Sequence, residues 1–226
     1  MHKSLFLAGL ALAAHAAFAD PVAGASSGTW VTPQPSGSVV TGVGSTTFSW
    51  GTTLAGSIDN QLVFTPVASF ASVTETPFKI GSVYYQNGTT TGGEAGAIDL
   101  GLALNFTTPA LGAISGNYGF KLTATTNTSD PDASADIVDL PSGFSSTSFL
   151  IGSTVYRVKL VGFQNVVGDG FLASSASEFH VREQLHATAD LYAVVTTEPI
   201  PEPSTYALMA LGLAGVGLTA RRRRAI

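Results

Sequence analysis

Alternation of apolar with small or polar residues is the feature of this chain that most constrains its fold. In the clearest segment every second side chain is apolar, and these are Ile98, Leu100, Leu102, Leu104 and Phe106. A β-strand turns successive side chains to opposite faces, so the pattern predicts a strand with one buried face. Residues 118–124 and 185–195 repeat the pattern.

Seven other segments are predicted as strands because β-branched and aromatic residues are frequent in them. They are residues 28–32, 46–50, 62–70, 79–85, 149–151, 155–163 and 178–182. Turn-forming sequences such as Asn87-Gly88 separate them, and no amphipathic helical pattern of ten residues is convincing. About ten short strands predict an all-β domain, an antiparallel β-sandwich or jelly roll.

The composition excludes several functional classes. Charged residues make up only 11% of the 226-residue chain, against about a quarter in typical soluble domains. Between residues 20 and 200, five basic residues stand against fourteen acidic ones, so nucleic acid is not an expected partner. The chain has no cysteine, which excludes thiolate catalysis, cysteine metal sites and disulfides.

The N-terminus has the pattern of a secretory signal peptide. A basic third residue precedes an apolar run over 4–18, and the small residues Ala17 and Ala19 flank a cleavage position. We therefore expect residues 1–19 to be removed by cleavage after Ala19. A short buried helix is the alternative, which His15 and the small-residue ending disfavour.

The C-terminus combines three elements in a fixed order. They are Pro201-Glu202-Pro203, an apolar segment over 204–220, and the basic cluster Arg221, Arg222, Arg223 and Arg224. An apolar stretch of about 16 residues is at the short limit for a single transmembrane helix. The arginines that follow it favour the cytoplasmic side of the inner membrane. A simple C-terminal membrane anchor is the alternative explanation.

This order of motif, helix and basic end resembles the PEP-CTERM sorting signal of Gram-negative bacteria. The resemblance implies that an exosortase, a membrane enzyme, recognises the tail and cuts near the Pro-Glu-Pro motif. It also implies export across the inner membrane, transient anchoring by the C-terminal helix, and a final place on the cell surface or outside the cell.

These features divide the chain into four parts. We expect a signal peptide over 1–19, a flexible lead-in over 20–27, a β-sandwich domain over 28–197 and the sorting tail over 198–226.

The body also resembles a choice-of-anchor K domain over about residues 28–195. The matching segments are Gly28-Thr29-Trp30, Phe48-Ser49-Trp50-Gly51, Pro77-Phe78-Lys79-Ile80-Gly81, Leu104-Asn105-Phe106, Ala135-Asp136-Ile137-Val138 and Val161-Gly162-Phe163. Where such domains often have Thr-His-x-Asn, only Asn87 matches. The resemblance implies an extracellular β domain that different proteins join to different surface anchors, and it supplies no activity.

Asp130, Asp132 and Asp136 are weak candidates for a calcium site, with Asp139 nearby. Calcium takes six to eight oxygen ligands, and closely spaced carboxylates can supply several of them. The spacing departs from the EF-hand pattern, so we favour a solvated acidic turn. We expect no bound metal and no cofactor.

A second polar set has alternating spacing: Glu178, His180, Arg182, Gln184 and His186. On one continuous strand these side chains would share a face, with the two histidines about 20 Å apart. That separation is too great for a shared metal ion, so we favour a polar outer face over a zinc or acid–base site.

The functional expectation is a non-catalytic, exported surface or matrix protein associated with exopolysaccharide. No nucleophile elbow and no phosphate-binding loop is present, although paired carboxylates of a hydrolase could still meet in the fold. The alternative is a lectin-like β-sandwich that binds carbohydrate. Trp30, Trp50, Tyr84 and Tyr85 could stack on a sugar if they were exposed, but core positions are the commoner place for such residues.

Overall fold

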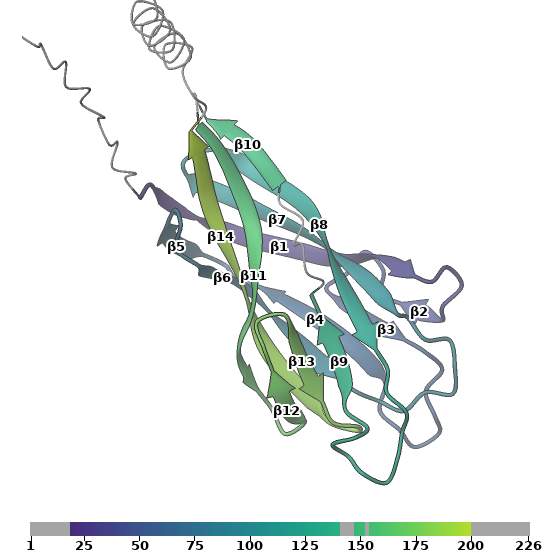
Figure 1. Cartoon of the computed structure of the whole chain (residues 1–226). Coiled ribbons are helices and arrows are strands. Elements are labelled where there is room, and N and C mark those ends of the chain that lie inside the picture. The colour runs from purple at the N-terminus through teal and green to yellow at the C-terminus, as the bar shows by residue number, and fades with distance from the viewer. Residues whose placement is uncertain (1–18, 141–146, 152–153, 200–226) are drawn as a thin grey trace, which may run out of the picture.

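The protein is an all-β molecule of two antiparallel sheets (Figure 1). The computed structural model describes residues 19–140, 147–151 and 154–199, and within these ranges there is no helix. The predicted all-β class with antiparallel sheets is therefore confirmed. The predicted signal peptide before residue 19 and the predicted C-terminal helix lie outside the described residues.

Each sheet has seven strands. The first contains, in spatial order, β12 (Phe171–Ser174), β13 (Glu178–Val181), β9 (Asp136–Asp139), β8 (Gly112–Thr123), β7 (Ala97–Thr108), β1 (Pro21–Gln34) and β5 (Phe70–Val73). The second contains β10 (Thr147–Ile151), β11 (Thr154–Val167), β14 (His186–Pro199), β6 (Phe78–Gln86), β4 (Asn60–Pro66), β3 (Thr47–Trp50) and β2 (Val40–Thr41).

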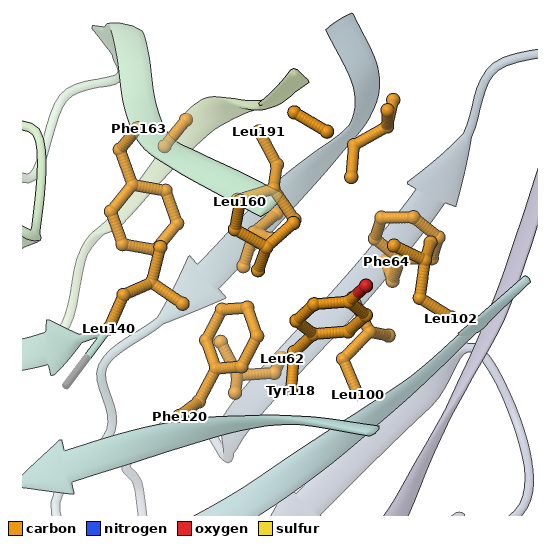
Figure 2. Packing of buried hydrophobic residues seen from close by; sticks show 14 of the residues in the cluster. Leu62, Phe64, Leu100, Leu102, Tyr118, Phe120, Leu140, Leu160, Phe163 and Leu191 are labelled. Carbon is orange, nitrogen blue, oxygen red and sulfur yellow. The ribbon is translucent and has the colours of Figure 1, made fainter. Parts of the chain in front are cut away.

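The core lies between the two sheets and takes residues from both (Figure 2). On β7 the five apolar residues predicted to share a face are at most 3% exposed, as the alternation requires. Phe120 of β8 faces Phe163 of β11 across the interior, with ring centroids 6.1 Å apart. Burying each large apolar side chain stabilises the fold by about 1.5–3 kcal/mol.

The predicted flexible lead-in over 20–27 is wrong, because residues 21–27 form the first half of β1. Pro21 pairs with Val73 of β5 on one side, and Gly24 pairs with Phe106 of β7 on the other. This backbone pairing, rather than side-chain alternation, holds the segment in place. Its residues are mostly small, so the sequence pattern could not reveal a strand there.

The strand predicted over 62–70 is also wrong, because it is two strands in different sheets. β4 ends at Pro66, which has no N–H to continue the sheet, and β5 begins at Phe70. Between them the backbone N–H of Val67 donates to the Ser26 hydroxyl at 2.9 Å. The chain thus crosses from the second sheet to the first at this point.

Candidate functional site

The two ends of the described chain lie at the same end of the sandwich (Figure 1). The hydroxyl of Tyr156 on β11 donates to the Asp20 carboxylate at 3.0 Å, and Tyr156 pairs with Thr197 near the end of β14. The backbone N–H of Asp20 donates to the Thr74 hydroxyl at 2.9 Å. Of the predicted cleavage residues, Ala19 is exposed.

The residues predicted to carry the sorting signal lie outside the described residues. They are Pro201, Glu202, Pro203, Arg221, Arg222, Arg223 and Arg224. Ala17, the other small residue of the predicted cleavage position, does so too. What the structure places is the point where the tail joins the body, at Pro199, which pairs with Thr154 of β11.

The structure does not bring the weak calcium candidates together. Asp132 is exposed and pairs with Arg182 at 2.5 Å, whereas Asp130 is exposed and accepts from the backbone N–H of Asp132. Asp136 is only 6% exposed and accepts from the backbone N–H of Thr125 at 2.7 Å. Among the described residues, no group of three or more His, Asp or Glu side chains is placed to hold a metal ion.

Asp136 belongs instead to a buried polar cluster around the hydroxyl of Tyr85. Three acceptor oxygens surround this one hydroxyl: Asp136 Oδ2 at 3.2 Å, Asn87 Oδ1 at 3.3 Å and Asn60 Oδ1 at 3.5 Å. All four side chains are at most 6% exposed. A phenol has one hydrogen to donate, so the cluster holds more acceptors than its hydroxyl can satisfy.

The amide orientations in this cluster are fixed by bonds to the backbone. The Asn87 side-chain nitrogen donates to the carbonyl of Val181 at 2.9 Å, and the Asn60 side-chain oxygen accepts from the N–H of Gly88 at 2.9 Å. Neither amide can rotate its nitrogen toward Tyr85 without losing that bond. A proton on Asp136 would supply the missing donor.

The electrostatics of the cluster favour a proton on Asp136. Burial raises the pKa of Asp136 to about 6, and the nearby carboxylate of Glu183 adds to this, although hydrogen bonds from Thr125 oppose it. Burial also raises the pKa of Tyr85 well above its ordinary value, so its hydroxyl stays protonated. Below about pH 6, Asp136 in this cluster is therefore protonated. Sequence inspection missed it because its members are far apart along the chain.

The continuous strand considered for residues 178–186 is wrong. His180 lies on β13 in the first sheet and contacts Glu178 at 3.3 Å, whereas His186 begins β14 in the second sheet. The segment between them contains Gln184 with φ of 61°, a backbone conformation that cannot continue a strand. The two histidines therefore belong to different sheets.

Most of the aromatic residues considered for sugar stacking are core residues. Trp30, Trp50 and Tyr85 are at most 4% exposed. Tyr84 is half-buried on the outer face of β6, and its ring lies 5.3 Å from the His186 ring, between centroids. Of this set, Tyr84 is the one residue outside the core.

A pocket of about 170 Å³ opens beside β2 and β3. Its wall includes Val40, Thr41, Ser49 and Trp50, and the carboxylate of Asp59 lies in it. Aliphatic and aromatic walls with a few polar groups are usual in small-molecule sites, although this pocket is smaller than most.

In the described parts of the chain, no helix has the length and apolar character needed to cross a membrane. No curated protein matches the chain. Residues 199–224 match the family model of the PEP-CTERM protein-sorting motif, so the tail marks an exported surface protein that is targeted by an exosortase.

Proposed function

We propose that this chain is a non-catalytic protein of the cell surface or extracellular matrix, associated with exopolysaccharide. The PEP-CTERM match at residues 199–224 carries the proposal. The signal-peptide pattern over 1–19 supports it, since both export and tail processing need the body to cross the inner membrane.

The shape of the body suits display away from a membrane. The tail joins the body at Pro199, and β14 runs about 40 Å from there to His186 at roughly 3.3 Å per residue. While the tail anchors the chain, the end of the sandwich that carries the pocket points away from the attachment point. That end is therefore the part of the body best placed to meet polymer outside the cell.

Two of the described carboxylates, Asp190 and Asp59, are held by structural contacts, which supports a non-catalytic role. Asp190 is held by Lys79 at 2.6 Å and by the hydroxyl of Ser82 at 3.0 Å, and these contacts lower its pKa even against partial burial. Asp59 in the pocket accepts from the hydroxyl of Thr53 at 2.5 Å. Carboxylates engaged in this way serve structure or recognition more readily than acid–base chemistry.

Fractionation of producing cells tests the association. We expect the chain to sediment with the exopolysaccharide layer and to enter the soluble fraction when polysaccharide synthesis is blocked genetically. The control is a periplasmic protein that stays in the periplasm in cells with and without polysaccharide synthesis. A distribution that is the same with and without polysaccharide would refute the association.

A further inference from the structure

We propose that the outer face of the second sheet, at the end away from the tail, is the binding site for a neutral polysaccharide chain. The site centres on a line of side chains that we call the polar row: His186, Gln86, Gln61, Ser49 and Thr41. This inference rests on the proposed association with exopolysaccharide and assigns the surface that makes the contact.

The strand register builds the polar row. His186 of β14 pairs with Gln86 of β6, which pairs with Gln61 of β4, and the line continues through Ser49 of β3 to Thr41 of β2. The residues beside the row along the strands point into the core, so row side chains face outward. The buried neighbours are Ala187, Tyr85, Leu62 and Trp50.

The spacing of the row suits an extended polymer. Neighbouring strands lie about 4.8 Å apart, so one polar side chain recurs at this interval across five strands. One sugar unit in an extended, β-linked polysaccharide advances by a similar distance. Successive sugars could therefore meet successive side chains of the row.

The polar groups of the row are already held in position. The Gln61 amide nitrogen donates to the Ser49 hydroxyl at 3.3 Å, and the Gln86 amide nitrogen donates to the carbonyl of Asp59 at 3.0 Å. The Tyr84 hydroxyl donates to the Gln86 side-chain oxygen at 3.0 Å. Each amide keeps a second N–H and lone pairs for sugar hydroxyls, and fixed side chains lose less entropy on binding.

An aromatic surface lies next to the polar groups. Tyr84 lies two residues along β6 from Gln86, on the same face and opposite Thr188 of β14, and its ring centroid is 5.3 Å from that of His186. Aromatic rings with a polar group are suited to ligands that have both apolar and hydroxyl-bearing surfaces, as sugar rings have.

The pocket lies at the β2 end of the polar row and provides a subsite for one sugar of the chain. Thr41 and Ser49 belong to both the row and the pocket, and Trp50 and Asp59 also line it. Its volume of about 170 Å³ suits a single ring-sized group. The Asp59 carboxylate is the strongest acceptor there, because hydrogen bonds to a charged oxygen exceed those to a neutral one.

The charge pattern selects a neutral polymer. Neither the row nor the pocket contains Lys or Arg, and Lys79, at the other end of β6, is paired with Asp190 at 2.6 Å. Between residues 20 and 200 acidic residues outnumber basic ones by fourteen to five, so a polyanion would be repelled.

Binding of purified components tests the site. The full chain in detergent is measured by affinity electrophoresis against the exopolysaccharide of the producing cells, split by anion exchange into neutral and acidic fractions. We expect retention by the neutral fraction. The double variant Gln61→Ala/Gln86→Ala should bind at least about tenfold more weakly, because two hydrogen-bonding side chains are lost. Tyr84→Ala should also weaken retention.

Gln164→Ala is the matched control, because Gln164 is an exposed glutamine of β11 outside the row. The Gln164→Ala variant should bind as the unchanged chain does. All variants should have the same unfolding midpoint as the unchanged chain. No retention by the neutral fraction, preference for the acidic fraction, or full binding by the double variant would each overturn the site. If the chain still sediments with exopolysaccharide in cells, the association stands and the site alone fails.

Discussion

At the scale of single residues, Asp136 makes the stability of the protein depend on pH. Its ordinary pKa of 3.8 rises to about 6 in the folded protein, chiefly through burial. Between these values the folded state binds more proton than the unfolded state, so stability falls as pH rises through this window. Above pH 6, ionisation of Asp136 lowers the free energy of unfolding by up to about 3 kcal/mol.

Asp136→Asn should remove this dependence. An amide in place of the carboxyl can accept from Thr125 and donate to the hydroxyl of Tyr85, as the protonated acid does. We expect urea unfolding at pH 7.5 to show a variant more stable than the original chain, with the difference vanishing near pH 4. Asp169→Asn, at an exposed carboxylate of the turn before β12, controls for general charge effects. Equal pH profiles for the Asp136 variant and the original chain would contradict the assignment.

At the scale of elements, β7 shows how firmly alternation determines the sheet. Leu102 is 2% exposed, whereas Asn105 on the same strand is exposed on the opposite face. Leu102→Ala should cost about 2–5 kcal/mol of unfolding free energy by leaving a cavity. Asn105→Ala should change it by no more than about 0.5 kcal/mol. Chemical denaturation measures both, and similar losses for the two variants would refute the predicted facing of β7.

Gly162 permits the irregularity of β11. The pairing with β14 shifts between Leu160 and Gly162, and Gly162 has φ of 127°. A Cβ there would collide with the backbone oxygen of Ala176. Gly162→Ala should therefore destabilise the fold by about 2 kcal/mol or more.

Gly96→Ala is the control for this substitution, because its Cβ would meet no atom closer than 4.0 Å. We expect a change of less than about 1 kcal/mol there, measured by the same thermal or urea unfolding. Equal effects at the two glycines would mean that the close approach at Gly162 is not what requires glycine.

Sequence patterns predicted elements where one face carries large apolar residues. That holds for β7 and β8, but not for the first half of β1, where residues such as Ala23 and Gly24 give no alternation. Short strands such as β2 and β12 were missed for a related reason, since pairing rather than composition defines them. A local pattern cannot show which distant segment will pair.

The same limit explains why the sequence did not predict the candidate site. The polar row assembles Thr41, Ser49, Gln61, Gln86 and His186 only through the register of five strands. The carboxylates that lie close in the sequence, Asp132 and Asp136, are turned to different surroundings by the fold. Sequence alone located the sorting tail because that signal is a contiguous motif.

At the scale of the whole molecule, the described ends of the chain and the proposed polysaccharide site lie at opposite ends of the sandwich. Both described ends of the chain meet near Asp20 and Thr197, whereas the pocket and the polar row lie at the far end of β14. Among the described residues, the buried side chains of the core lie between Val22 and Val195.

The most direct test of delivery by the tail is the intact mass of the mature protein. It is measured from cells with an active exosortase and from cells that lack the enzyme. With the enzyme, we predict a chain that begins at Asp20, ends near Pro201-Glu202-Pro203 and lacks Arg221 to Arg224. Without it, the tail should remain. A mature chain that keeps the complete tail in the presence of active exosortase would contradict the account.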